Sequence, residues 1–134
     1  MNADTVESYL MRMEIPSEPL GDGSWVLAPQ GLRRSRILVQ VAPPIVLFAT
    51  PIFEVSAATP DREGLFRRLL ELNEELLHCA YGLQGAQVVL SGAQQLENLD
   101  FNEFQAMIDD ISMSLDRHLG ELAPWRPADP QEGA

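Results

Sequence analysis

The stretch from Leu69 to Gly92, LLELNEELLHCAYGLQGAQVVLSG, changes its hydrophobic period half-way and constrains the fold more than any other part of the chain. Its first ten residues carry leucines at helical spacing. The following AYGLQGAQVVLS carries apolar residues at strand spacing around a Gly-Ala turn. A helix that is followed by a hairpin with almost no loop predicts a module in which the helix packs on the sheet of that hairpin.

The remaining segments extend this pattern into an α+β order. A helix is predicted after Asp4 and Thr5, and Thr59-Pro60-Asp61 is predicted to open the second helix. Asp100 is predicted to cap the third helix, with Glu103 at the capping-box spacing. Strands are predicted at 24–28, 36–42, 45–50, 52–57, 80–84 and 87–91, and the last two helices at 59–78 and 100–122. The expected fold is an antiparallel sheet packed by helices, in the order α-β-β-β-α-β-β-α.

Two features of this order stay open at the level of sequence. Pro51 lies between two β-rich runs, so residues 45–57 form either one kinked edge strand or two short strands. The segment after Pro124 has proline, glycine and charge but no periodicity. We therefore expect one domain over residues 1–122 and a disordered tail over 123–134.

Length and charge exclude several classes of protein. The 134 residues suit one domain, and the formal net charge of −11 argues against nucleic acid and against anionic membrane surfaces as partners. The N-terminal segment has no signal-peptide pattern, and no apolar run reaches the length of a membrane span. One cysteine allows no internal disulfide, so we expect a cytoplasmic protein.

The helix predicted over 59–78 has an apolar face wider than the stripe of about 100° on an ordinary core-facing helix. One stripe contains Leu65, Leu69, Leu72 and Leu76, a second contains Phe66, Leu70 and Leu77, and Asn73 lies between them. Either neighbouring elements of the same fold cover both stripes, or one stripe contacts another protein. In the second case the predicted dimer or partner interface comprises Leu65, Leu69, Leu72, Asn73 and Leu76. Asn73 is then a residue that fixes the dimer register, or else a satisfied core amide.

The strands carry more apolar residues than a sheet with one wet face requires. If helices cover one face, part of the other face needs a cover too, and a large exposed apolar patch usually marks a binding surface. The predicted partner-binding face of the sheet comprises Leu38, Leu47, Ile52 and Val89.

Few residues of this sequence suggest catalysis or metal binding. A Cys–His dyad needs a positioned base and an oxyanion site, and a structural zinc site needs about four ligands at recognisable spacing. His78, Cys79 and His118 show neither pattern. Cys79 is predicted to be a small buried hydrophobic residue. His118 is predicted to act as a charge near the C-terminal end of the last helix. We expect no catalytic residue, no metal site and no cofactor.

With these elements placed, the chain resembles the YbjN family, which is labelled as bacterial sensory transduction regulators and shares its fold with the class I chaperones of type III secretion. The resemblance rests on the LLELN-type helix, the hairpin AYGLQGAQVVLSG, the LENLD connector and the amphipathic helix FNEFQAMIDDISMSLDRHL, and covers about residues 6–122. It implies a small acidic homodimer that holds an extended segment of another protein on apolar patches. It implies no catalytic residues.

Three hypotheses follow. The first is a non-enzymatic, chaperone-like protein-binding domain that forms a homodimer. The second is a regulatory or adaptor domain of the same fold that binds a folded partner. The third is a small-ligand-binding protein or enzyme with a pocket between helices and sheet, and the absence of convergent polar residues argues against it.

Overall fold

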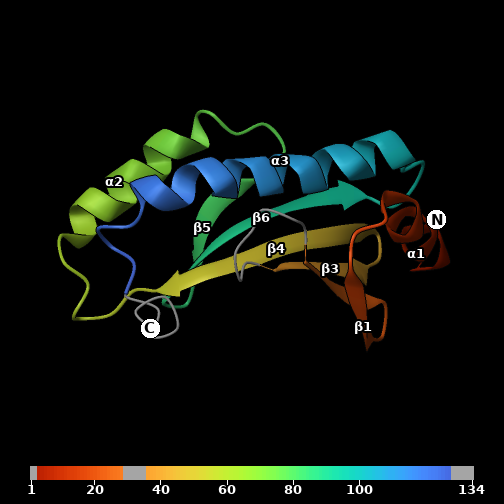
Figure 1. The fold of residues 1–134 in the computed structure, drawn as a ribbon, viewed down its shortest axis with the longest axis horizontal. Coiled ribbons are helices and arrows are strands. Elements are labelled where there is room, and N and C mark those ends of the chain that lie inside the picture. Colours follow the sequence, from red (N-terminus) through yellow and green to blue (C-terminus); the bar gives the residue numbers. More distant parts are fainter. Residues whose placement is uncertain (1–2, 29–35, 128–134) are drawn as a thin grey trace.

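The computed structural model describes residues 3–28 and 36–127, which form one antiparallel sheet with helices on one of its faces (Figure 1). The elements are α1 (Ala3–Met13), β1 (Ser17–Gly21), β2 (Ser24–Leu27), β3 (Ile37–Ala42), β4 (Ile45–Glu54), α2 (Arg62–Asn73), β5 (Ala80–Gln84), β6 (Gln87–Gln95) and α3 (Phe101–Glu121). The α+β class and the antiparallel sheet are confirmed. One strand more than expected precedes α2.

The six strands lie in the order β1-β2-β3-β4-β6-β5, and every neighbouring pair is antiparallel. The additional strand is β1, which the sequence did not reveal because its five residues, SEPLG, are all exposed and contain a proline. A proline is tolerated in an edge strand. The strand β1 therefore extends the sheet at one margin, and β5 forms the other.

The strand β4 is continuous through Pro51, so the region is one strand and not two. The predicted edge position was wrong, because β4 lies between β3 and β6. The pairing between β3 and β4 ends at Leu38 and Ala49, so Pro51 lies beyond the end of β3. The register with β6 shifts between Pro51 and Phe53, which marks a bulge. The missing N–H of the proline thus removes no hydrogen bond to β3, and the bulge absorbs the irregularity.

The core lies between the sheet and the helices α2 and α3, which run along the same face in Figure 1. Alternate residues of β4, among them Val46 and Phe48, are fully buried on this side, as are Leu65 and Leu72 of α2 and Ile108 of α3. Among the described residues, no helix covers the opposite face of the sheet. That asymmetry leaves one side of β3, β4 and β6 open.

The helix α3 begins where the sequence placed it, because the Asp100 side chain accepts a hydrogen bond of 2.7 Å from the Glu103 N–H. An aromatic cluster then joins α1 to α3: the Tyr9 ring contacts Phe101 and Phe104, and the Tyr9 hydroxyl donates to the Leu99 carbonyl at 2.9 Å. The start of α3 is therefore fixed by a cap and by packing.

The helix α2 is shorter than expected at both ends. Its N-cap is Asp61, which accepts from the Gly64 N–H, so Pro60 precedes the helix instead of occupying its first position. At its other end α2 stops at Asn73, five residues before His78. The Asn73 side chain accepts from the Tyr81 N–H at 2.7 Å and donates to the Tyr81 carbonyl at 3.2 Å. Asn73 is thus a satisfied amide within the monomer.

The packed chain also continues beyond Leu122, where the sequence placed a domain boundary. Trp125 is partly buried against the core, and its indole N–H donates to the Asp61 carbonyl at 3.2 Å. The contact has a simple reason, since an indole supplies both a large apolar surface and a polar N–H that finds a partner. Residues 128–134 of the expected tail lie outside the described residues.

Candidate functional site: apolar protein-binding surfaces

The open face of the sheet carries a shallow cavity of about 440 Å³. It is lined by Leu38, Gln40, Leu47, Phe48, Ala49, Gln84, Ser91, Gly92 and Ala93. The register explains this grouping, because Leu47 stands opposite Gln40 on one side and Ala93 on the other. Leu47 is 37% exposed, and Leu38 is half-buried. The cavity is therefore a hollow with apolar side chains and a few amide and hydroxyl groups.

Only part of the predicted sheet face lies in this hollow. Leu38 and Leu47 line it, whereas Ile52 and Val89 do not. Ile52 sits at the β4 bulge and packs partly against the core. Val89 stands opposite Pro51 and Gly82 and is only 3% exposed. Ile52 and Val89 thus offer little surface to a partner in this structure.

The two stripes of α2 have exchanged the roles that the sequence assigned to them. Leu65, Leu69 and Leu72 are buried against the sheet of the same chain, and Leu76 is partly buried with them. The residues of the other stripe face outward: Phe66 is 36%, Leu70 69% and Leu77 88% exposed. Leu77 lies in the α2–β5 loop, because α2 ends at Asn73. Periodicity identifies two stripes, but both are rich in leucine, so it cannot say which one faces the sheet.

A further exposed apolar residue lies on the edge strand at this margin of the sheet. Leu83 of β5 is 50% exposed, and β5 is the edge strand on which the end of α2 is held through Asn73. We call Phe66, Leu70, Leu77 and Leu83 the outer stripe. Sequence reasoning missed Leu83 because a leucine in a short hairpin strand is expected to face the core.

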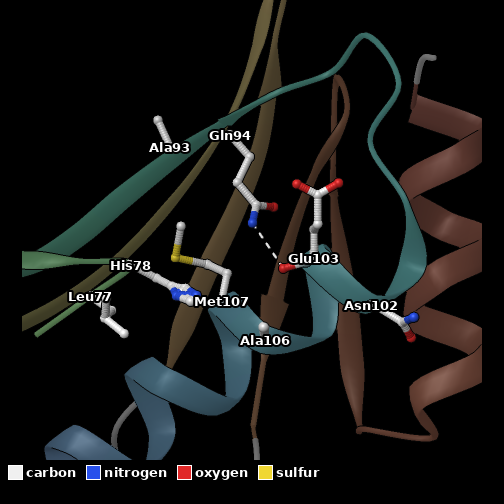
Figure 2. Close-up of a pocket in the computed structure, with 8 residues that line it drawn as sticks. All are labelled: Leu77, His78, Ala93, Gln94, Asn102, Glu103, Ala106 and Met107. Atoms are coloured by element: carbon white, nitrogen blue, oxygen red, sulfur yellow. Dashed lines mark hydrogen bonds between the residues drawn. The ribbon is translucent and has the colours of Figure 1, made fainter.

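A second cavity, of about 500 Å³, lies between β6 and α3 (Figure 2). It is lined by Leu77, His78, Ala93, Gln94, Asn102, Glu103, Ala106 and Met107. Figure 2 shows Ala93 and Gln94 pointing to opposite sides of β6, and the Gln94 amide donates to the Glu103 carbonyl at 2.9 Å. We call this cavity the α3 hollow. No pattern in the sequence indicated it, since it depends on where the α2–β5 loop runs.

The α2–β5 loop is held in place by Asp110 of α3. The Asp110 carboxylate accepts from the His78 N–H at 3.1 Å and lies 3.6 Å from the Cys79 sulfur. Burial, and then the Asp110 charge, raise the pKa of the Cys79 thiol to about 12. Cys79 is thus a buried thiol with little thiolate at neutral pH. A β-carbon on Gly92 would lie 2.6 Å from the His78 carbonyl oxygen, so only glycine allows this close approach.

His118 of α3 is only 2% exposed. Its Nδ1 atom is 2.8 Å from the Tyr81 hydroxyl, and its Nε2 atom is 3.9 Å from the Glu75 carboxylate. Burial lowers the pKa of His118, an effect that the nearby Glu75 opposes. The imidazole therefore acts as a neutral packing and hydrogen-bonding group between α3 and β5, and not as a charged group at a helix end.

Within residues 3–28 and 36–127, no group of three or more His, Cys, Asp and Glu side chains could hold a metal ion. The described helices include none that is both long and apolar enough to cross a bilayer. The surfaces that stand out are therefore the apolar ones.

Comparison with protein-family models identifies the family of this chain. The model of the CesT_Tir_1 family matches residues 1–126. The chain belongs to the CesT_Tir_1 family. A search of curated proteins found no match.

Several solved structures share the fold of this CesT_Tir_1 chain. YbjN from E. coli, named as a candidate transcription regulator, is 15% identical, with a TM-score of 0.66 over 90% of this chain and 93% of YbjN. A chain of the heterodimeric ExoU–SpcU complex, from the type III secretion system of Pseudomonas aeruginosa, is 14% identical with a TM-score of 0.66, over 92% and 99% of the two chains. A chain of the ExsC–ExsE complex is 15% identical, with a TM-score of 0.62 over 95% of this chain and 95% of that chain. At these identities the comparisons show the fold.

Proposed function

We propose that this protein is a non-catalytic, chaperone-like binding domain that holds a segment of a partner protein on its exposed apolar surface in the cytoplasm. The observation that carries the proposal is the hollow on the open sheet face, where Leu38 of β3 and Leu47 of β4 lie without a covering helix among the described residues. Apolar patches of this kind are unusual on monomeric proteins and favour protein contacts. The neighbouring structures add support, since ExoU–SpcU and ExsC–ExsE are complexes of two proteins.

We also propose that the outer stripe is the contact between two copies of the chain. Leu70 and Leu77 are too exposed to contribute much to the core, and their removal from water supplies a favourable term of roughly 25 cal/mol per Å². Arg67 and Glu71 flank Leu70, are both exposed and form an ion pair of 3.8 Å within the chain, which a two-fold contact can exchange for pairs between copies. In a two-fold contact, Arg67 of one copy can lie near Glu71 of the other, which suits a self-complementary surface.

The proposed function is tested by capture of partner proteins with three forms of the immobilised chain. Wild type and Leu20→Asp should retain the same partner, because Leu20 lies on β1, away from the hollow. Leu47→Asp places a charge in the hollow and should lose that partner. If all three forms retain the partner, the partner does not bind the hollow on the open face of the sheet. A captured partner that binds only in its folded state would favour the regulatory function over the chaperone-like one.

A further inference from the structure

His118 of α3 is an enclosed ionisable side chain, and one of its two ring nitrogens lacks a partner. The Nδ1 atom lies 2.8 Å from the Tyr81 hydroxyl, whose pKa is raised by burial, so this contact stays neutral. The buried Nε2 atom has no hydrogen-bond partner within residues 3–28 and 36–127. Protonation would place a charge and a second N–H donor on this ring. What acidification does therefore depends on the surroundings of Nε2.

The charged groups that act on His118 come from three segments. Arg117 and Glu121 lie on α3, Arg68 lies on α2, and Glu75 lies on the α2–β5 loop of residues 74–79. Arg68 and Glu121 pair at 2.8 Å, so their opposite charges largely offset each other at the ring. The Glu75 carboxylate is 3.9 Å from Nε2, but its side chain is 55% exposed. Glu75 thus attracts a proton to His118 through a partly solvated contact, and Arg117 opposes it.

Most side chains of the α2–β5 loop are exposed to solvent. Leu76 is half-buried and Cys79 is buried, whereas the other four residues are exposed. The His78 N–H of the loop donates to the Asp110 carboxylate at 3.1 Å. Segments with few buried contacts open at a lower free-energy cost than the whole domain. The loop is therefore the element beside Nε2 that opens most readily.

Acid favours an open form of this loop. Burial lowers the pKa of His118, whereas an imidazole in water takes up a proton near its ordinary value of 6.5. Opening of the loop exposes Nε2 to water, so the open form binds the proton more tightly than the closed form does. By linkage, the open population rises as the pH falls through about 6.5. Glu75 limits this rise, because its charge favours the protonated ring in the closed form.

We propose that His118 is an acid-sensitive latch, which holds the α2–β5 loop on α3 while the ring is neutral and releases the loop when the ring is protonated. Leu77 and His78 of this loop line the α3 hollow (Figure 2), and Leu77 also belongs to the outer stripe. Acid should therefore remove one wall of the α3 hollow and displace Leu77 from the outer stripe. The latch is a property of the single chain, so it stands or fails independently of the proposed function.

Cys79 reports the opening, because it is the one cysteine of the chain and is only 8% exposed at the end of the loop. Its labelling by a dipyridyl disulfide, which reacts with thiols in acid, is measured at about pH 7 and about pH 5 for wild type and His118→Gln. Division of the wild-type rate by the variant rate at each pH removes the pH dependence of the reagent. On acidification this ratio should rise severalfold, and the ordinary value of 6.5 sets a ceiling of about 25-fold.

Three further variants sharpen the test. His78 is the other histidine of the chain and is exposed on the same loop, so His78→Gln is the matched control and should follow wild type within about twofold. Glu75→Gln removes the charge that favours the protonated closed form, so it should be labelled in acid at least as fast as wild type. His118→Asn is a second neutral replacement that keeps the comparison decisive if His118→Gln does not fold.

Low concentrations of urea separate the latch from an effect on global stability. Local opening exposes little surface, so labelling through the loop should hardly change with urea, whereas labelling through global unfolding follows the full m-value. A ratio that rises in acid and is insensitive to urea supports the latch. An unchanged ratio overturns it, because Glu75 then neutralises the imidazolium without any opening. A ratio that rises but follows global unfolding in urea also overturns it, since His118 then stabilises the whole domain and holds no loop.

Discussion

Replacing Asn73 tests whether its amide fastens α2 to the edge of the sheet. Asn73→Ala deletes both hydrogen bonds to Tyr81 and leaves the Tyr81 backbone without these partners. Each hydrogen bond contributes about 1 kcal/mol net, so the free energy of unfolding should fall by about 2 kcal/mol. For a domain of this length, that loss corresponds to a decrease in melting temperature of roughly 6–10 °C.

The assay is urea unfolding followed by circular dichroism, with thermal melts beside it. Asn73→Asp keeps the size of the side chain and the acceptor for the Tyr81 N–H, but it points an oxygen at the Tyr81 carbonyl. It should therefore lose at least about 1 kcal/mol. Asn102→Ala, an exposed asparagine on α3, is the matched control and should change little. If Asn73→Ala and Asn73→Asp both unfold like wild type, the amide does not fasten the helix.

Three further predictions address the outer stripe, the buried histidine and the C-terminal contact. In light scattering, wild type should give twice the 14.9 kDa of one chain, and Leu70→Asp should give a monomer. Met113 is equally exposed but lies on α3, so Met113→Asp should remain a dimer. A monomeric wild type would contradict the proposed homodimer. Because burial lowers the pKa of His118 below 6.5, the unfolded chain takes up a proton that the folded protein resists, and the free energy of unfolding should fall with pH below about 6.5. In urea unfolding between roughly pH 7 and pH 5, the free energy of unfolding of His118→Gln should fall less steeply than that of wild type. An equal slope for both proteins would contradict the contribution of His118. Trp125→Ala should cost about 1–2 kcal/mol in urea unfolding, and an unchanged midpoint would show that the indole contact contributes nothing.

The architecture could be predicted because most elements carry a local signal. The amphipathic face of α3, its Asp100 cap and the Gly85 turn between β5 and β6 depend on residues close in sequence. The strand β1 carries no such signal, since an edge strand that is exposed on both faces needs no alternation. The end of α2 could not be predicted either, because the Asn73 side chain bonds to a strand that begins seven residues later.

The binding surfaces were predictable in kind and less so in position. An excess of leucine on α2 indicated a second contact, but only packing shows that Leu65 and Leu69 face inward while Leu70 faces outward. Alternation indicated Leu38 and Leu47 on the open face. The α3 hollow depends on the Asp110 contact with the α2–β5 loop, which joins residues 32 positions apart. Long-range contacts of this kind leave no periodic trace.

The central claim is that the open face of the sheet holds a segment of another protein. The most direct measurement is hydrogen–deuterium exchange of the complex with its captured partner, compared with the free chain. We predict slower exchange at Leu38–Gln40 and Leu47, and no change on the outer surface of α3 around Met113. Protection confined to α3, with unchanged exchange at Leu38–Gln40 and Leu47, would contradict this account.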